Sequence, residues 1–125
     1  MIKTRPLADD AEKSELVSEY GLDVGQKYDA LELWDGDNKT GYIFMTIKGD
    51  TVYFEKFILT AEYSDMEKHF FLDFLMRSAA SYAENRGIEN MVSHDADMRE
   101  FLLKKGFKEE NDAVCAPISL IVHYN

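Results

Sequence analysis

The chain has 125 residues, of which 46% are hydrophobic and 13% aromatic, so it suits one compact domain with a substantial core. Lys and Arg number 14 against 24 Asp and Glu, which gives a formal net charge of −10. Nucleic acids and anionic membrane surfaces attract positively charged proteins, so we expect neither of them as a partner.

The cell compartment is predicted from what the sequence lacks. The amino-terminal stretch "MIKTRPLADD" has no apolar run of the kind that a secretion signal needs, and no apolar run of about 18 residues occurs anywhere. The single cysteine, Cys115, cannot form an internal disulfide, and we expect it to be a buried core thiol. A cytoplasmic protein is therefore the expectation.

The first elements are a strand and a helix. Residues 1–5 predict a strand that stops near Pro6. Residues 8–21 predict a helix, because Asp9 or Asp10 can cap its amino terminus and a glycine stands at its end.

Three apolar runs after a loop at 22–29 predict an antiparallel meander. The runs are 30–34, 41–48 and 51–59. The turn signals "DGDNKTG" and "GD" separate them, which is typical of consecutive hairpins.

The stretch 65–86 changes to helical periodicity and predicts a long helix, with Asp73 and Arg77 as an i,i+4 pair and Gly87 as terminator. A cluster of Phe70, Phe71 and Phe74 on this helix favours a core position. The apolar positions at helical spacing are Met66, Phe70, Phe71, Phe74, Leu75, Ala79 and Tyr82.

The rest of the chain predicts a strand at 88–93, a helix at 96–106, and a final pair of strands within 107–124 around "END". The whole order is β-α-β-β-β-α-β-α-β-β. It predicts an α/β (α+β) fold, a single domain over 1–125 with a mixed, mostly antiparallel sheet flanked by helices.

Two stretches carry a resemblance to a known family. "FILTAEYSDMEKHFFLDFLMRSAASYAENRGI" resembles the central strand, loop and helix of the GNAT superfamily of acetyl-CoA-dependent N-acetyltransferases. "MREFLLKKGFKEE" resembles the later helix of that family and its turn into the next strand. The resemblance spans nearly the whole chain and implies the GNAT fold.

The resemblance also implies where a cofactor would bind. The family holds the pyrophosphate of CoA on a loop patterned Q/R-x-x-G-x-G/A, because backbone N–H groups at a helix start bind anions and glycines allow a close approach. "SDMEKH" takes this place, so Ser64 replaces the Q/R, and Glu67 and His69 replace the two small residues. Acetyl-CoA would then contact Leu59, Thr60, Met66, Glu67, Lys68, His69 and Phe70.

Three further positions follow from the resemblance. A tyrosine that protonates the departing thiolate falls on Leu102, and an asparagine near the cofactor falls on or near His94 or Asp95. A catalytic base on the central strand falls on Glu55. The alternative for Glu55 is a surface glutamate paired with Lys56 or with a lysine of another strand.

The stretch "SHDAD" suggests a metal ligand set or a histidine base, but no second histidine has a metal-binding spacing with His94. A loop in which an aspartate caps the next helix is the simpler interpretation, so we expect no metal.

The sequence therefore predicts an acetyltransferase-family protein with weak or absent activity, because its loop lacks glycine and the general acid is replaced. The alternative is a non-catalytic module that binds a small ligand or a protein. An active enzyme would take a small-molecule or peptide amine as acceptor. A homodimer formed through exposed strand edges is a further expectation.

Overall fold

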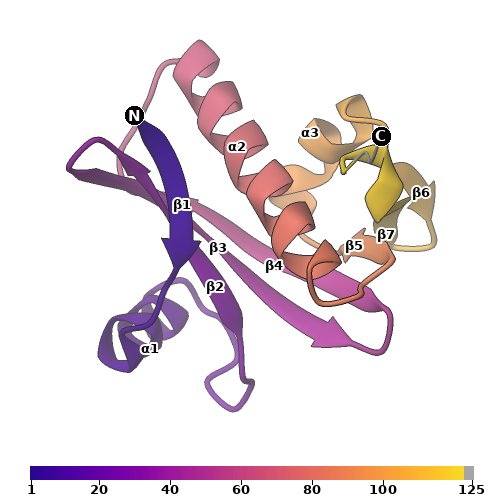
Figure 1. Ribbon diagram of the computed structural model, residues 1–125, viewed down its shortest axis with the longest axis horizontal. Helices are drawn as coiled ribbons and strands as arrows, with labels where there is room; N and C mark the ends of the chain where they lie inside the picture. The colour runs from indigo at the N-terminus through magenta and orange to yellow at the C-terminus, as the bar shows by residue number, and fades with distance from the viewer. Residues whose placement is uncertain (123–125) are drawn as a thin grey trace.

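The computed structural model describes residues 1–122, and its elements follow the predicted order (Figure 1). The strands are β1 (Ile2–Pro6), β2 (Asp29–Asp35), β3 (Asn38–Lys48), β4 (Thr51–Leu59), β5 (Asn90–Ser93), β6 (Lys108–Glu110) and β7 (Ala113–Pro117). The helices are α1 (Asp10–Glu19), α2 (Asp65–Glu84) and α3 (Arg99–Lys104), with short 3-10 turns η1 (Ala96–Met98) and η2 (Ile118–Leu120).

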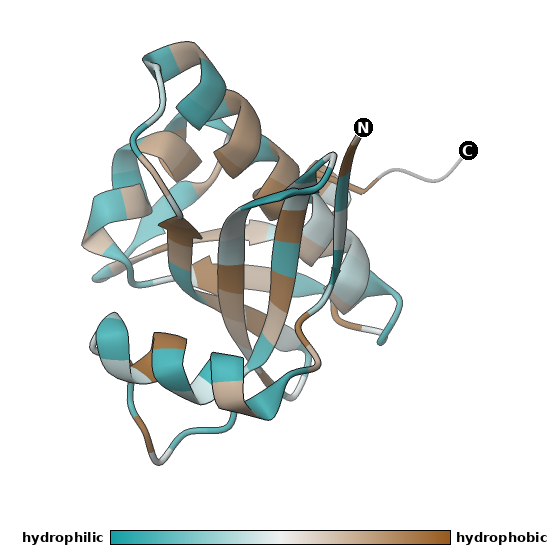
Figure 2. Ribbon diagram, turned by 90° about the vertical axis from the view of Figure 1, so that its left-hand side faces the viewer, coloured by the Kyte–Doolittle hydropathy of each residue, from teal (hydrophilic) through white to brown (hydrophobic). Residues whose placement is uncertain are grey.

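One sheet of seven strands organises the molecule, in the order β1-β2-β3-β4-β5-β7-β6. All neighbours are antiparallel except β4 and β5, which are parallel. Helix α2 crosses one face of the sheet, and α1 lies on the opposite face (Figures 1 and 2). This arrangement confirms the predicted α+β fold with a mixed, mostly antiparallel sheet.

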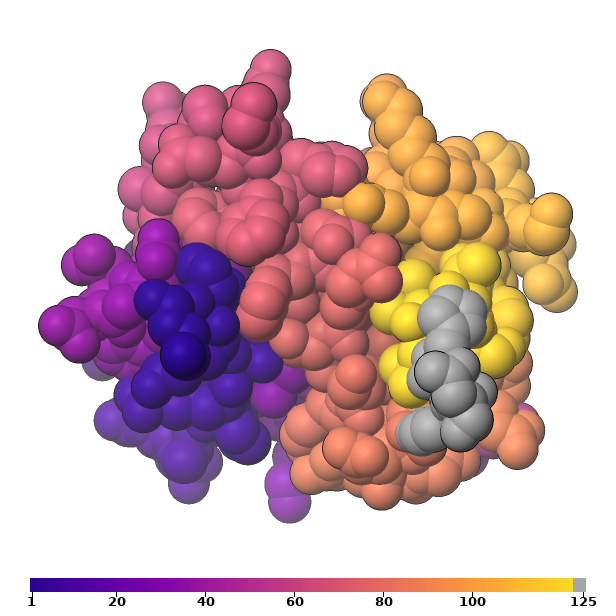
Figure 3. Space-filling view, turned by 45° about the horizontal axis from the view of Figure 1, so that its top comes forward, coloured from indigo at the N-terminus to yellow at the C-terminus, as the bar shows by residue number. Residues whose placement is uncertain are grey.

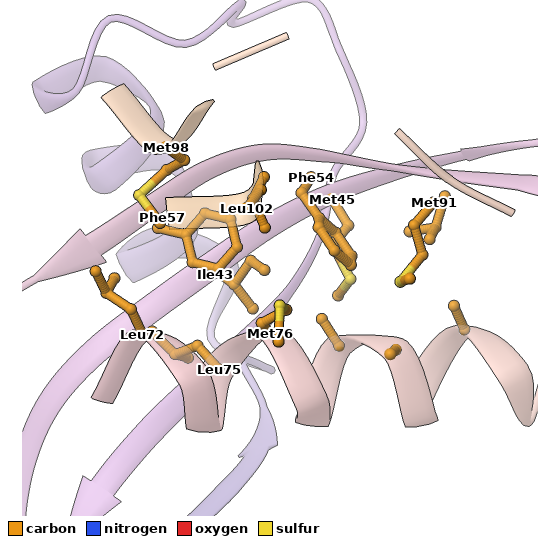
Figure 4. Close-up of a cluster of buried hydrophobic side chains, with 14 of the residues drawn as sticks. Ile43, Met45, Phe54, Phe57, Leu72, Leu75, Met76, Met91, Met98 and Leu102 are labelled. Carbon is orange, nitrogen blue, oxygen red and sulfur yellow. The ribbon is translucent and has the colours of Figure 1, made fainter. Parts of the chain in front are cut away.

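The main core lies between the sheet and α2, with contributions from η1 and α3 (Figure 4). Alternate side chains of β2, β3 and β4 point to this layer, as the two-residue period of a strand requires. The predicted apolar face of α2 is only partly correct, because Phe71 is buried while the side chains of Met66 and Phe70 are 84% and 49% exposed. Side chains labelled in Figure 4 are Ile43, Met45, Phe54, Phe57, Leu72, Leu75, Met76, Met91, Met98 and Leu102.

Helix α1 is fixed to the sheet by a charged network. Asp9 caps its first turn, as predicted, because its carboxylate accepts the backbone N–H groups of Ala11 and Glu12. From the helix, Glu12 accepts hydrogen bonds from Lys39 Nζ (2.7 Å) and from Tyr42 Oη (2.6 Å). Lys39 also pairs with the buried carboxylate of Glu32 at 2.9 Å. The network ties α1 to β2 and β3 across the sheet face opposite α2.

Two predicted boundaries are wrong. The "DGDNKTG" segment is not a long loop, because β2 runs to Asp35 and β3 begins at Asn38, with Gly36 at φ +61° in a tight turn between them. The final strand ends at Pro117, which pairs with Asn90 at the start of β5. Residues 118–120 form η2 instead, and 123–124 lie outside the described residues.

Cys115 is only half-buried, although burial raises the pKa of its thiol above the ordinary value. Among residues 1–122, none of the helices combines the length and apolar character that crossing a membrane requires.

Candidate functional site

The candidate site lies where β4 and β5 separate. The two strands pair over only three residues each, starting with Thr51 and Asn90. β5 then ends at Ser93, while β4 continues to Leu59. The buried hydroxyl of Ser93 donates a hydrogen bond to the carbonyl oxygen of Phe54 at 3.0 Å and fastens the strands at the point where they part.

A cleft of about 780 Å³ fills the opening between the second half of β4, the first turns of α2, and the η1–α3 segment. Its walls combine an apolar floor with a charged rim of three carboxylates and two lysines. The residues that line it are Phe57, Leu59, Asp65, Lys68, His69, Leu72, Asp97, Met98, Glu100, Phe101 and Lys104. An apolar cleft with a few polar groups at its mouth suits a small ligand.

A β-bulge in β4 borders the opening. Lys56 pairs with Phe44, and Phe54 pairs with Met45, so Glu55 is the extra residue on this strand. The bulge changes which side chains face α2, because Phe54 and Phe57 both belong to the main core although three positions separate them. Glu55 and Lys56 therefore both lie on the face of the sheet that α1 covers.

Glu55 lies half-buried at this bulge. Its Oε2 accepts a hydrogen bond from the hydroxyl of Thr46 at 2.8 Å. Lys56 was the expected partner of Glu55 if Glu55 were a surface residue. Its Nζ instead lies 3.8 Å from Asp97 Oδ2 across the opening. Glu55 is not among the residues that line the cleft, and its side chain lies on the opposite face of the sheet from Phe57 of the cleft floor.

The start of α2 is closed by its own side chains. The hydroxyl of Ser64 accepts the backbone N–H of Glu67 at 3.2 Å and donates to the Glu67 carboxylate at 3.0 Å. This is a serine cap, in which one side chain occupies one of the backbone donors that a helix start would otherwise present to a ligand, here the N–H of Glu67. Asp65 and Glu67 also place two carboxylates in the first turn.

The structure gives the seven predicted cofactor-binding residues three different placements. Leu59, Lys68 and His69 line the cleft. The backbone N–H of Thr60 donates a hydrogen bond to the carbonyl oxygen of Thr40 at 3.0 Å, so this donor is not open to a ligand. The other three predicted residues are not among those that line the cleft; they are Met66, Glu67 and Phe70.

Sequence reasoning missed the wall that η1 and α3 contribute. Phe101 and Lys104 recur at a spacing of three on α3, a helical signal that was present in the sequence. Lys105 adds a bridge to α2, because its Nζ lies 3.0 Å from His69 Nε2 and 2.8 Å from Asp73 Oδ1.

Asp73 also accepts from Arg77 at 2.9 Å, which confirms the predicted pair within α2. Burial alone would raise the pKa of Asp73, but the hydrogen bonds from Lys105 and Arg77 hold this pKa below its ordinary value. The carboxylate is therefore a charged anchor that joins α2 to α3 at the end of the cleft.

The positions where the family has its tyrosine and asparagine are occupied by residues that pack in the core or make local contacts. Leu102 is fully buried in the main core, so a side chain there does not reach the cleft, and Phe101 faces it instead. Asp95 accepts the backbone N–H of Asp97 at 3.1 Å, which confirms the predicted aspartate cap. Burial raises the pKa of Asp95. The ring of His94 stacks on Tyr53 with centroids 6.3 Å apart.

The described residues 1–122 contain no group of three or more His, Cys, Asp and Glu side chains placed to hold a metal ion.

Several solved structures with this architecture are acetyltransferases by description. A GNAT-family protein from Desulfovibrio desulfuricans matches with a TM-score of 0.69 and 12% identity, over 94% of this chain and 99% of its own. The ribosomal-protein-S18-alanine N-acetyltransferase of Escherichia coli matches with a TM-score of 0.66 and 12% identity, over 94% of each chain. A Bacillus subtilis acetyltransferase in complex with CoA matches with a TM-score of 0.63 and 14% identity, over 92% and 96%.

At these identities the likeness establishes the fold. No family model and no curated protein matches the sequence. The chain has the fold of the GNAT acetyltransferases, and its cleft lies beside the part of β4 that continues past the end of β5.

Proposed function

We propose that this protein is acetyltransferase-like, and that its cleft receives an acyl-pantetheine arm but binds the diphosphate of acetyl-CoA poorly. Its acyl-CoA-dependent activity is accordingly weak or absent. The observation that carries the proposal is the closed start of α2, where Ser64 and Glu67 bond to each other. The acceptor in any residual reaction is a small-molecule or peptide amine.

The physical reason is competition for the helix start. A helix amino terminus binds phosphates through unsatisfied N–H groups and a partial positive charge. Here the Glu67 N–H is already bonded to Ser64. The carboxylates of Asp65 and Glu67 also lie in the first turn, where they interact with the partial positive charge of the helix start in place of a phosphate. Each carboxylate repels a phosphate charge by on the order of 1 kcal/mol at 4 Å in water. Lys68 and Lys104 on the cleft wall offset part of this repulsion.

The apolar floor supports the other half of the proposal. Phe57, Leu59 and Leu72 line the cleft where β4 leaves β5. A pantetheine arm is largely uncharged, so it can lie along such a floor without the phosphate contacts. Its thioester would then reach the opening beside Glu55.

Thermal melting with two ligands tests this proposal. A ligand at about 100 times its dissociation constant adds about 2.7 kcal/mol, which would raise the melting temperature of a domain of this size by several degrees. We expect acetyl-CoA at 1 mM to raise it by a measurable shift of about 1–2 °C, and S-acetylpantetheine, which lacks phosphates, to give the same small shift. A shift of several degrees with acetyl-CoA alone would show that the helix start does hold the diphosphate and would refute the proposal.

The role of Glu55 is tested separately by transfer from acetyl-CoA to a panel of primary amines, followed as free thiol. Glu55→Gln should lower any residual rate by about 100-fold, the contribution expected of a general base. Thr46→Val is the matched control, because it removes the hydrogen bond to Glu55 but keeps the carboxylate, and most of the rate should remain. An undiminished rate in Glu55→Gln would exclude this residue as the base.

The same closed helix start favours a second candidate, a non-catalytic module that binds a small ligand. This candidate predicts that neither acetyl compound shifts the melting temperature at all.

A further inference from the structure

A separate depression lies between the edge strand β1 and α2. It measures about 420 Å³. Helix α2 packs mainly over β2, β3 and β4, while Ile2 of β1 packs against the main core and Thr4 and Pro6 line the groove beside the helix. Figure 3 shows this side of the molecule, with β1 in indigo next to α2 in rose. The groove is formed mainly by Thr4, Pro6, Leu31, Phe74, Ser78 and Tyr82.

The hydrogen-bond register of β1 shows which of its backbone groups point outward. Leu7 N donates to Ala30 O at 2.9 Å, and Gly36 N donates to Met1 O at 3.0 Å. In an antiparallel pair, hydrogen-bonded positions alternate with positions that point away from the partner strand. The odd-numbered residues of this segment therefore bond to β2, and the even-numbered residues face the open edge.

The outward groups form a short template for another strand. Ile2 and Thr4 each offer an N–H and a carbonyl, whereas Pro6 offers only a carbonyl and so limits the pairing to one end. Within the described residues β1 pairs with β2 alone. An extended peptide that adds to such an edge gains main-chain hydrogen bonds, and its side chains select the sequence.

Charge indicates what kind of segment fits. Lys3 and Arg5 extend from β1 on the α1 face, and Arg5 keeps 53% of its side chain exposed although it pairs with Glu32. On the other face, Arg77 lines the groove with 55% of its side chain exposed. Three cations thus lie along this edge in a chain whose net charge is −10, although Arg5 and Arg77 are already paired with Glu32 and Asp73. If two copies of β1 paired with each other, Lys3 and Arg5 of one copy would lie near those of the other, and the repulsion between like charges disfavours such self-pairing.

We propose that the β1–α2 groove binds an extended segment of a partner protein in which acidic and apolar residues alternate, paired to β1 as an added edge strand. Alternate side chains of an added strand point to opposite faces of the sheet. The apolar set would face Phe74 and the floor of the groove, while the acidic set would face Lys3 and Arg5.

A labelled hexapeptide of alternating glutamate and valine, (Glu-Val)₃, tests the proposal with the full chain. We expect it to bind in fluorescence polarisation at low salt and to shift the amide NMR signals of Ile2 and Thr4. Thr4→Pro removes an outward N–H and leaves the bonds to β2 intact, so affinity should fall at least tenfold. Thr4→Val keeps the N–H and should bind within about twofold of the wild type.

A charge reversal keeps the test decisive if Thr4→Pro does not fold. Lys3→Glu, on the face that the acidic set would contact, should weaken (Glu-Val)₃ binding at least fivefold. Lys108→Glu, on the opposite edge strand β6, is the matched control and should leave the affinity unchanged.

Four results would overturn the proposal. They are no binding of (Glu-Val)₃, equal binding of (Lys-Val)₃, NMR shifts confined to the cleft between β4 and β5, and a dimer of the chain that Thr4→Pro abolishes.

Discussion

Replacing Glu67 and His69 together by glycine should raise the affinity for acetyl-CoA at least tenfold, which corresponds to about 1.4 kcal/mol. The Glu67 change removes the carboxylate that Ser64 holds at the helix start. The His69 change removes a ring from the wall of the cleft. Backbone N–H groups can then approach the diphosphate without a Cβ between them. Isothermal titration measures the gain directly.

Two controls separate space from charge. Glu67→Gln with His69→Ala removes the carboxylate and the ring but keeps both Cβ atoms, so we expect only part of the gain. Glycine at two positions in the first helical turn costs about 1 kcal/mol each at most, and a melting curve will show whether the variant remains folded. A folded double-glycine variant with no gain in affinity would mean that the Glu67 carboxylate and the two Cβ atoms are not what weakens CoA binding, because Ser64 can still cap the N–H of residue 67.

Lys39→Met should lower the free energy of unfolding by about 3 kcal/mol, because it leaves the buried Glu32 and the half-buried Glu12 without their shared cation. In urea this corresponds to a fall in the midpoint of about 1.5 M at an m-value of about 2 kcal/mol/M. Lys104→Met is the matched control, since its pair with Glu100 is exposed and is worth about 0.5 kcal/mol or less. Equal midpoints for the two variants would show that the network contributes nothing.

The effect of Lys39→Met should depend on pH. Burial acts to raise the pKa of Glu32, but hydrogen bonds from Lys39 and Arg5 outweigh it and hold this pKa below the ordinary value of 4.5. A carboxylate with a depressed pKa in the folded state stabilises the fold above its unfolded pKa, and this contribution is lost as the pH falls through the folded value. The difference between wild type and variant should therefore be full at pH 7 and smaller at pH 3, as followed by urea unfolding.

The same network has an alkaline limit. Burial, followed by the hydrogen bond to Glu12, raises the pKa of Tyr42 to about 12. A raised pKa in the folded state means that the stabilisation is complete below the unfolded value of about 10 and is lost as the pH rises toward 12. The attachment of α1 to the sheet thus weakens at both ends of the pH scale.

Local signals in the sequence predicted much of the fold. Asp9, Asp95 and the glycine at the end of α1 act within a few residues of where they stand, so their capping roles could be predicted without knowing the tertiary structure. The start of β3 at Asn38, three residues before the predicted strand, could not be predicted in this way. Its polar residues are stabilised by distant partners, as Lys39 is by Glu12, 27 residues away in the sequence.

The candidate site was harder to predict for the same reason. The resemblance directed attention to the start of α2, and Lys68 and His69 do line the cleft. The opposite wall comes from α3, and the contact of Lys105 with His69 joins residues 36 positions apart. Periodicity shows that a helix has an apolar face, but not which cleft its charged face borders.

The extra residue in β4 divides this strand into two halves, and the alternate positions that face α2 differ between them. In the first half the even-numbered positions, such as Val52 and Phe54, face α2, whereas beyond Glu55 the odd-numbered Phe57 does so. If the strand kept Glu55 but alternated regularly through it, Phe57 would turn toward α1 and Ile58 toward α2, exchanging two buried layers without changing the composition. Any comparison of relatives across this strand must therefore allow a one-residue offset at Glu55, or it will pair residues that belong to opposite sides of the sheet.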